Sequence, residues 1–391
     1  MPDWFGYADF DAVAVQLDEQ GRVLIPDALY DGLTLQFDPV FRQMIGKTGR
    51  GQSVHFMRML PDPIVRNVIE EVLIPAGDVT LAATLSLPEG TGPHPAMVMI
   101  SGRGCWGRGR SFGRVLTRYG MAVLEYDKRG TGQSSGDCDR ATFDQLVADA
   151  GAALQWLRDD PRIDARRVGL QGGSAGAWTA QGVAALALDD PDFDVPAYIV
   201  TYIGPSTSIE TQQRESGDAL ADQLGLDESA KAAIQRSVDV TLDFTLSNET
   251  VFAELDAIRE KASEEGWLSQ MFGDTDLPVS PEAVDQLWLR RFQFDPASTF
   301  SRLGSMPYLS LLGEDDSIVP LPYNADALRE AMPDNPNLKI VIIPGTGHGV
   351  EHGDRDPVLP DGTTYRKFDT VEPLYFTELI DFLRVHGQLP R

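Results

Sequence analysis

The stretch VGLQGGSAGAW, from Val168 to Trp178, places a serine between an apolar strand and a helix. Its residues 172–176 satisfy the pattern G-x-S-x-G. Small residues around the serine of such a turn let strand and helix lie close together while the serine adopts a strained backbone. Ser174 is therefore a candidate nucleophile. The alternative is a serine that only caps the following helix after a glycine-rich turn.

Strand-like and helix-like segments alternate along most of the chain around Ser174. Apolar runs that predict strands cover residues 94–101, 121–127, 166–172, 197–204, 306–313 and 338–345. Segments with helical periodicity cover residues 112–120, 142–160, 174–188, 324–332 and 372–386, and Thr142 is placed to cap the second of them. This alternation predicts an α/β fold whose mostly parallel sheet is covered by helices on both faces.

Other regions precede or interrupt the alternation. Residues 1–65 contain short, often alternating runs broken by Gly, Asp and Pro, which predicts a small β-rich segment. Residues 67–90 predict an antiparallel hairpin that turns at Gly77-Asp78. The polar, helical text from 206 to 302 lies between two sheet strands, so we expect a cap over the strands' carboxyl ends, where ligands bind in open α/β sheets. The predicted domains are a β-rich segment (1–65), a core in two parts (66–205 and 303–391) and a helical cap (206–302).

A serine hydroxyl becomes a good nucleophile only when a base takes its proton and an acid orients that base. The chain has five histidines, which are His55, His94, His348, His352 and His386. His348 directly follows the last sheet strand in a glycine-rich loop, at the end of the sheet that faces Ser174. We therefore expect His348 to be the base, with His352 of the same loop as the alternative.

Three acidic residues, Glu314, Asp315 and Asp316, directly follow the strand before that of His348. Carboxylates in a surface turn often face solvent or stabilise the turn. However, the order serine, acid, histidine along the chain is that of an α/β-hydrolase triad. Each candidate also follows a different predicted strand, so one of these acids can reach the histidine loop.

Four segments together resemble those of α/β-hydrolases. They are YDKRGTGQSSG (126–136), GGSAG (172–176), GEDDSIVP (313–320) and PGTGHG (344–349). From about Arg66 onward the chain is similar to lid-bearing bacterial serine esterases, including acyl-thioesterase and bile-acid acyltransferase domains and dienelactone-hydrolase-like enzymes. In that family x-x-Val-Pro follows the acid, so the resemblance implies Asp316 rather than Asp315.

The resemblance also implies an oxyanion loop at ISGRGCW, residues 100–106, where backbone N–H groups of Arg103 and Ala175 would hold a tetrahedral oxyanion. Many relatives have His-Gly where this chain has Ser101-Gly102. Arg103 is also larger than the usual small residue. Main-chain donors do not depend on side chains, so this difference concerns substrate preference and leaves the oxyanion role intact.

The same loop has a second interpretation as a dinucleotide-binding turn. Gly102, Gly104 and Gly107 have the G-x-G-x-x-G spacing, and Asp127 lies about 20 residues on, where such a site has its ribose-binding acid. The loop follows the hairpin strands and does not open the first strand–helix–strand unit. This interpretation also leaves Ser174 unexplained.

Several side chains near the loop and in the cap are candidates for substrate contacts. Arg103, Arg108 and Arg110 either hold a substrate carboxylate or pair with the abundant acidic residues. The apolar cap residues are Trp267, Met271, Phe272, Trp288, Phe292 and Phe294. We expect Trp267, Phe272, Trp288 and Phe292 to face the core, and Trp106 and Trp288 to contact the substrate.

Composition excludes some classes of function. The formal net charge of −26 argues against general nucleic-acid binding, because such a surface repels phosphates. Cys105 and Cys138 provide neither a disulfide framework nor a metal set. The first residues lack a secretion signal, and no apolar run reaches the ~18–20 residues of a spanning helix, so we expect a cytoplasmic location without a membrane span. The oligomeric state is left open, with a homodimer as one option.

These features predict a serine hydrolase that cleaves small-molecule carboxylic esters or thioesters through an acyl-enzyme, without a metal or organic cofactor. Acyl transfer by the same triad is an alternative, which product analysis with and without acceptors would separate from hydrolysis. A non-catalytic binding protein of the same fold is the other alternative, and the intact set of Ser174, Asp316 and His348 argues against it.

Overall fold

The computed structural model describes residues 16–17, 23–25, 33–38, 43–48, 53–57, 68–108, 112–191, 193–273, 276–349 and 373–389. They belong to two compact units. The first contains an antiparallel sheet of β1 (Gln16–Leu17), β2 (Val23–Ile25), β3 (Leu33–Asp38), β4 (Gln43–Thr48) and β5 (Ser53–Met57), paired in that order. The β-rich N-terminal segment is thus confirmed.

The second unit, residues 66–350 and 374–391, is built on an eight-stranded sheet of order β13-β12-β11-β10-β8-β9-β7-β6. The strands are β6 (Val68–Ala76), β7 (Val79–Leu87), β8 (His94–Ile100), β9 (Ala122–Tyr126), β10 (Ile163–Gly173), β11 (Ile199–Tyr202), β12 (Tyr308–Gly313) and β13 (Leu338–Ile343). β6 and β7 form the predicted antiparallel hairpin, and β8 to β13 pair in parallel. This confirms the mostly parallel sheet.

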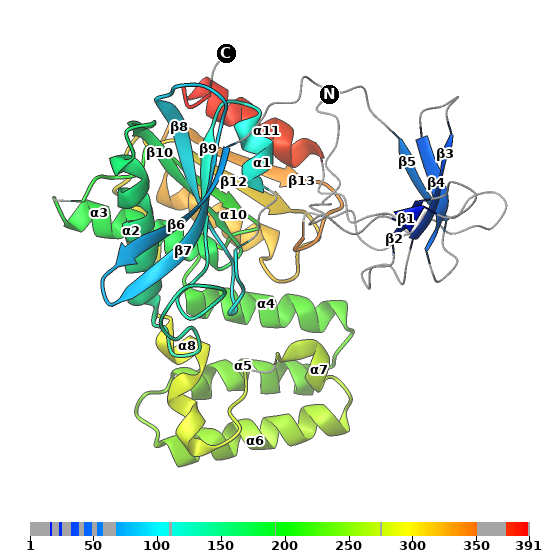
Figure 1. Cartoon of the computed structure of the whole chain (residues 1–391). Helices are drawn as coiled ribbons and strands as arrows, with labels where there is room; N and C mark the ends of the chain where they lie inside the picture. The colour runs from blue at the N-terminus through cyan, green and yellow to red at the C-terminus, as the bar shows by residue number, and fades with distance from the viewer. Residues whose placement is uncertain are drawn as a thin grey trace. The chain divides into compact units, whose positions relative to one another are not determined.

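Helices cover both faces of the sheet, as its nearly continuous apolar strands require. They are α1 (Phe112–Thr117), α2 (Phe143–Asp159), α3 (Gly176–Asp189), α10 (Leu321–Ala331) and α11 (Pro373–Val385). Figure 1 shows α2 and α3 together on one side of the sheet and α1 with α11 on the other. Thr142 caps α2 as predicted, because its side chain accepts from the Gln145 N–H while the Gln145 side chain accepts from the Thr142 N–H.

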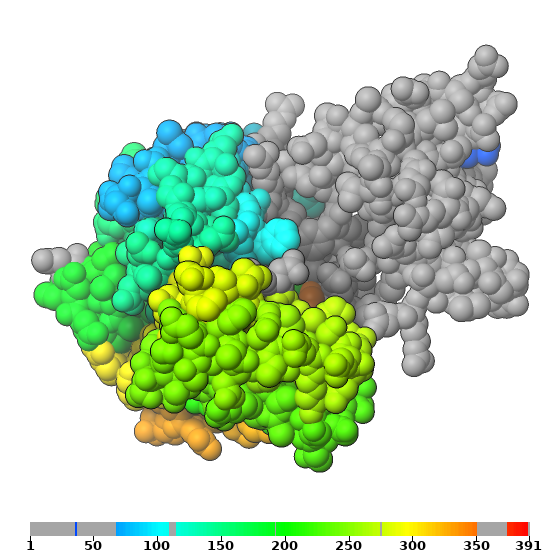
Figure 2. Space-filling view, turned by 90° about the horizontal axis from the view of Figure 1, so that it is seen from below, coloured from blue at the N-terminus to red at the C-terminus, as the bar shows by residue number. Residues whose placement is uncertain are grey.

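A helical cap lies between β11 and β12. It consists of α4 (Ile209–Gln223), α5 (Glu228–Leu242), α6 (Asn248–Glu264), α7 (Leu268–Met271), a 3₁₀ helix (Pro281–Gln286), α8 (Trp288–Arg291) and α9 (Ala297–Phe300). Helices α4, α5 and α6 stack below the sheet in Figure 1, and the view from below in Figure 2 shows their side chains as one continuous surface. No helix in the described part of the chain combines the length and apolar character that crossing a bilayer requires.

The cap has a hydrophobic core of its own. Val251 and Leu255 of α6 are fully buried in it, and Trp267 packs there against Phe272 with ring centroids 6.2 Å apart. The N–H of Trp267 donates to the carbonyl of Ala262, which turns the chain back onto α6. The expectation that Trp267 faces the core is therefore wrong.

Candidate active site

Ser174 lies in the sharp turn between β10 and α3. Its backbone has a φ of 49°, a left-handed conformation that is rare for a residue with a side chain. The neighbouring glycines are required by close packing. A Cβ on Gly172 would lie 2.3 Å from the Gly176 oxygen, and one on Gly176 would lie 2.4 Å from the Ile100 oxygen. The G-x-S-x-G pattern thus reflects how closely this turn packs against the sheet.

His348 follows β13 and joins Ser174 to an acid. Its Nε2 lies 2.9 Å from Ser174 Oγ, and its Nδ1 lies 2.9 and 3.1 Å from the two carboxylate oxygens of Asp316. An ionised carboxylate only accepts hydrogen bonds, so we assign the ring hydrogen to Nδ1. Nε2 is then free to accept from the Ser174 hydroxyl, which is the orientation that a general base needs.

Asp316 is the member of the acidic turn that reaches His348. It is 5% exposed, and its Oδ1 also accepts from the N–H groups of Ile318, at 2.8 Å, and Val319, at 2.9 Å. The turn after Asp316 thus supplies two N–H donors that hold the buried carboxylate in place. The exposed Asp315 does not contact the imidazole, while Glu314 accepts from the N–H of Gly345.

The proposed oxyanion loop follows β8 and lies against Ser174. A Cβ on Gly102 would lie 3.1 Å from the Cβ of Ser174, so glycine is needed for this approach. The backbone N–H groups of Arg103 and Ala175 have no hydrogen-bond partner among the residues that the structure describes. His352 and Arg110, two other candidates from the sequence, lie outside the described residues.

A cavity of about 500 Å³ extends from Ser174 and His348 between the core and the cap, a volume typical of small-molecule sites. Its apolar lining includes Trp178, Leu220, Ile234, Met271, Phe272 and Trp288. Its charged lining side chains among the described residues are Arg103 and Asp276, which form an ion pair with a distance of 2.9 Å. The described wall of this cavity therefore carries no excess charge of either sign.

A second cavity, of about 540 Å³, shares the walls formed by Arg103, Ala175 and Trp288 with the first. Trp106 is 71% exposed and lines this second cavity, not the one that contains Ser174. Trp288 lines both, and the Arg103 guanidinium lies 5.1 Å from the centroid of its ring. Trp288 and the Arg103 side chain thus lie where the two cavities meet.

The two cysteines form a disulfide between Cys105 of the proposed oxyanion loop and Cys138. The expectation that they contribute no disulfide framework is therefore wrong. The residues are 33 positions apart, and only the folding of β8 and β9 side by side brings the loops after these strands together. Sequence spacing does not reveal that meeting.

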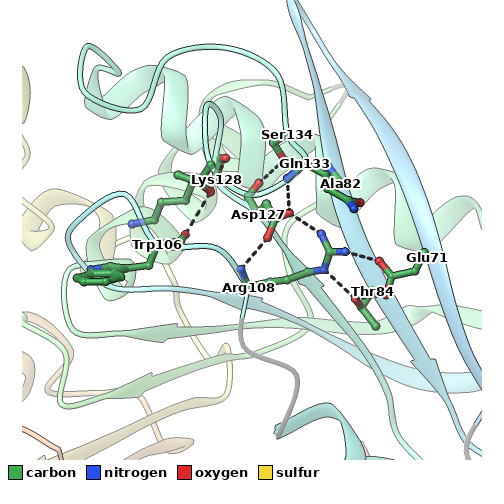
Figure 3. Close-up of polar contacts among 10 residues, drawn as sticks. Glu71, Ala82, Thr84, Trp106, Arg108, Asp127, Lys128, Gln133 and Ser134 are labelled. Carbon is green, nitrogen blue, oxygen red and sulfur yellow. Dashed lines mark hydrogen bonds and ion pairs between the residues drawn. The ribbon is translucent and has the colours of Figure 1, made fainter. Parts of the chain in front are cut away.

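The arginines of this region pair with acidic residues. Arg103 pairs with Asp276 of the cap. Arg108 donates to Asp127 at 2.6 Å and also contacts Glu71, as Figure 3 shows. Of the two interpretations drawn from the sequence, pairing within the protein is the one that these two arginines follow.

Two residues beside the site were missed by the sequence analysis. Asp276 pairs with Arg103 across 173 positions, and no local pattern indicates such a contact. Lys128 lies two residues after the end of β9 and is 6% exposed, and burial lowers the pKa of its ammonium to about 8. A lysine between a buried strand and a glycine-rich turn is a usable signal, since lysines are almost never fully buried without a partner.

The sheet order, the strained serine turn and the Ser174–His348–Asp316 contacts define an α/β-hydrolase of the serine-hydrolase class. The family described as X-Pro dipeptidyl-peptidase (S15 family) matches residues 77–273, about half of the chain. The chain belongs to this family.

Individual relatives match this chain at low sequence identity or over a small part of its length. An uncharacterised 31.7 kDa protein of Escherichia coli, from the traX-finO intergenic region, is 31% identical over 108 residues, which are 27% of this chain and 37% of that protein. Among solved structures, an esterase of Pyrococcus furiosus is 14% identical with a TM-score of 0.49, covering 84% of this chain and 98% of that one. A puromycin-hydrolysing peptidase of Mycobacterium tuberculosis is 20% identical with a TM-score of 0.49, covering 96% and 54%.

Proposed function

We propose that this serine hydrolase cleaves carboxylic esters or thioesters through an acyl-enzyme. The observation that carries the proposal is the continuous hydrogen-bonded series of Ser174, His348 and Asp316 at one end of a charge-balanced, largely apolar cavity. In it, Ser174 is the nucleophile, His348 the general base and Asp316 the orienting acid.

The reaction has two halves. Ser174 Oγ bonds to the substrate carbonyl carbon as its proton passes to His348 Nε2, and the N–H groups of Arg103 and Ala175 bind the oxyanion. His348 then gives the proton to the leaving alcohol or thiol, and the acyl–oxygen or acyl–sulfur bond breaks. Water repeats the steps on the acyl-enzyme, giving a carboxylic acid and free Ser174.

The charge of the cavity supports neutral acyl groups. A dipeptidyl-peptidase binds a substrate with a free N-terminal ammonium, and a cation in such a site needs an anionic partner. Asp276 is the only carboxylate that lines the described wall of the Ser174 cavity, and Arg103 already pairs with it. Cleavage of X-Pro dipeptides is the second candidate function, favoured by the family match.

A substrate comparison tests the proposal. We expect kcat/KM for aryl esters and thioesters of uncharged acyl groups to exceed that for an X-Pro anilide by about 100-fold or more, the worth of an unpaired buried charge. A fluorophosphonate should label Ser174, as located by peptide mass spectrometry. Preference for the X-Pro anilide would support the second candidate, and failure to label Ser174 would refute both.

Trp288 provides a test of the acyl pocket. It is buried where α8 meets the core, with ring centroids 6.5 Å from Trp178 and 5.9 Å from Phe292. Trp288→Ala enlarges the cavity, so we expect the preference for acyl chain length to shift toward longer chains by about tenfold in kcat/KM, with the smallest ester changed least.

The measurement is a rate series over aryl esters of increasing acyl length. Trp267→Ala is the matched control, because Trp267 is another buried cap tryptophan and lines neither described cavity. It should lower the thermal stability without altering the order of preference. An equal loss at every chain length in Trp288→Ala would show that Trp288 only packs the cap.

A further inference from the structure

Several contacts to the proposed oxyanion loop and to the residues that follow it come from one segment of the chain, residues 127–138. Contacts occur at alternate loop positions: Lys128 donates to the carbonyls of Gly102 and Gly104, the Thr131 hydroxyl lies 3.2 Å from the carbonyl oxygen of Trp106, and Asp127 accepts from the N–H of Arg108 at 2.7 Å. Figure 3 shows Asp127 facing Arg108 at this end of the contact. The Cys105–Cys138 disulfide adds a covalent link between the same two segments.

Lys128 has a special place among these contacts, because Gly102 lies next to both its ammonium and the proposed nucleophile. The Gly102 carbonyl accepts from Lys128 Nζ, while a Cβ on Gly102 would lie 3.1 Å from the Cβ and 3.6 Å from the Oγ of Ser174. Among the described residues, Lys128 is the one whose charged group donates to the carbonyl of Gly102, the loop residue next to Ser174.

The peptide group between Gly102 and Arg103 connects the Lys128 ammonium with the proposed oxyanion donor, the Arg103 N–H. It is trans, since the only cis peptide bond among the described residues is Gly92–Pro93. In a trans peptide the carbonyl and the N–H point in opposite directions. A carbonyl held by Lys128 therefore directs the Arg103 N–H away from the ammonium, and a cation on the carbonyl polarises that N–H into a stronger donor.

We propose that Lys128 is the positioning residue of the oxyanion hole, because it holds the Gly102 carbonyl and thereby aims the Arg103 N–H at the developing oxyanion. This inference rests on the proposed function, in which that N–H binds the oxyanion. Lys128 contacts the loop and not the reacting atoms, so its effect passes through the peptide group. The stabilisation that Lys128 adds is specific to the transition state, because only there does negative charge develop on the substrate carbonyl oxygen.

The proposal has a pH dependence. Burial lowers the pKa of Lys128 to about 8, so the ammonium is present at neutral pH and is lost as the pH rises through about 8. The charged side chains that share its cavity are Arg103, Asp139 and Arg291. Its chain neighbours Asp127 and Arg129 are already paired with Arg108 and Asp149. A neutral amine is a weaker donor, so kcat should fall on this alkaline side.

The experiment compares Lys128→Met with Thr131→Val on one aryl ester. We expect Lys128→Met to lower kcat by about 100-fold with KM changed by less than about threefold, which is the pattern of a lost transition-state donor. Its pH profile should lack the alkaline fall near pH 8. Thr131→Val removes a hydroxyl that contacts the carbonyls of Trp106 and Lys128 but keeps the ammonium, and it should keep kcat within about threefold.

A kcat of Lys128→Met close to that of the unaltered enzyme, an alkaline fall that persists in it, or an equal loss in Thr131→Val would overturn the proposal. If Lys128→Met does not fold, Lys128→Arg provides the same test, because a guanidinium keeps its charge through the pH range in which the lysine loses its own. The alkaline fall should then move to higher pH, and an unmoved fall contradicts the role of Lys128. Fluorophosphonate labelling of Ser174 separates failure of the proposed function from failure of this inference. If Ser174 is labelled and Lys128→Met keeps its kcat, only the inference about Lys128 is refuted.

Discussion

Replacing Ser174 by alanine is expected to lower kcat by about 10⁶-fold, the loss typical of a triad that acts as a unit. In the proposed mechanism Oγ is the atom that forms the acyl-enzyme, and no other hydroxyl in the described residues contacts His348. The remaining rate would come from substrate binding and from the N–H groups of Arg103 and Ala175 acting on attack by water. Ser174→Ala removes one oxygen without changing the packing of the turn, so the fold should be retained.

The measurement is single-substrate kinetics with an aryl ester, together with the thermal unfolding of each variant. Ser216→Ala is the matched control, since Ser216 lines the same cavity on α4 and has no contact with His348. Its kcat should stay within about threefold of the unaltered protein. Full activity in a folded Ser174→Ala protein would remove the proposed mechanism.

The arrangement of strands and helices could be predicted because it follows from local patterns. A strand covered on both faces is a nearly continuous apolar run, as in Ala122–Tyr126, whose five residues are all buried and include one charged residue, Glu125. The cap was recognisable because it breaks that alternation between β11 and β12. The direction that each cap side chain takes was not predictable, since the path of the chain after α6 turns Trp267 inward, and no period in the sequence describes such a turn.

The residues of the candidate triad could be predicted from the sequence for a similar reason. Ser174, Asp316 and His348 each follow a different parallel strand, and parallel strands bring their carboxyl ends to one edge of the sheet. Contacts between loops are a different matter. The pairing of Arg103 with Asp276 and the bond between Cys105 and Cys138 depend on the conformations of long loops. The local sequence around these residues does not indicate those conformations.

The proposed oxyanion loop combines features that the sequence reveals with contacts that only the structure reveals. Its glycines are visible in the sequence and allow its close approach to Ser174, but they also leave its backbone free to adopt many conformations. Contacts from residues 127–138 remove that freedom, through Lys128, Asp127 and the disulfide. A preorganised donor costs no rearrangement when charge develops on the substrate. The structure thus gives a physical reason for the second glycine-rich motif, YDKRGTGQSSG, which the sequence analysis could only match to a family.

Asp316→Asn is expected to lower kcat by about 10⁴-fold, because it imposes the wrong tautomer on His348. The orientation of the new amide follows from the existing bonds. Oδ1 of Asp316 accepts from the N–H groups of Ile318 and Val319, and only an oxygen can take that place. The amide nitrogen must then occupy the position of Oδ2, which lies 2.9 Å from His348 Nδ1.

With an amide N–H facing it, Nδ1 has to accept, so the ring hydrogen moves to Nε2. Nε2 then donates toward Ser174 and can no longer take its proton, while the fold keeps every other contact of the turn. The test compares kcat of Asp316→Asn with that of Asp315→Asn, whose exposed side chain does not contact the imidazole and whose kcat should change by less than about threefold. Retention of the proton resonance of Nδ1–H in Asp316→Asn, or a larger loss in Asp315→Asn, would contradict this assignment and move the orienting role to the neighbouring acid.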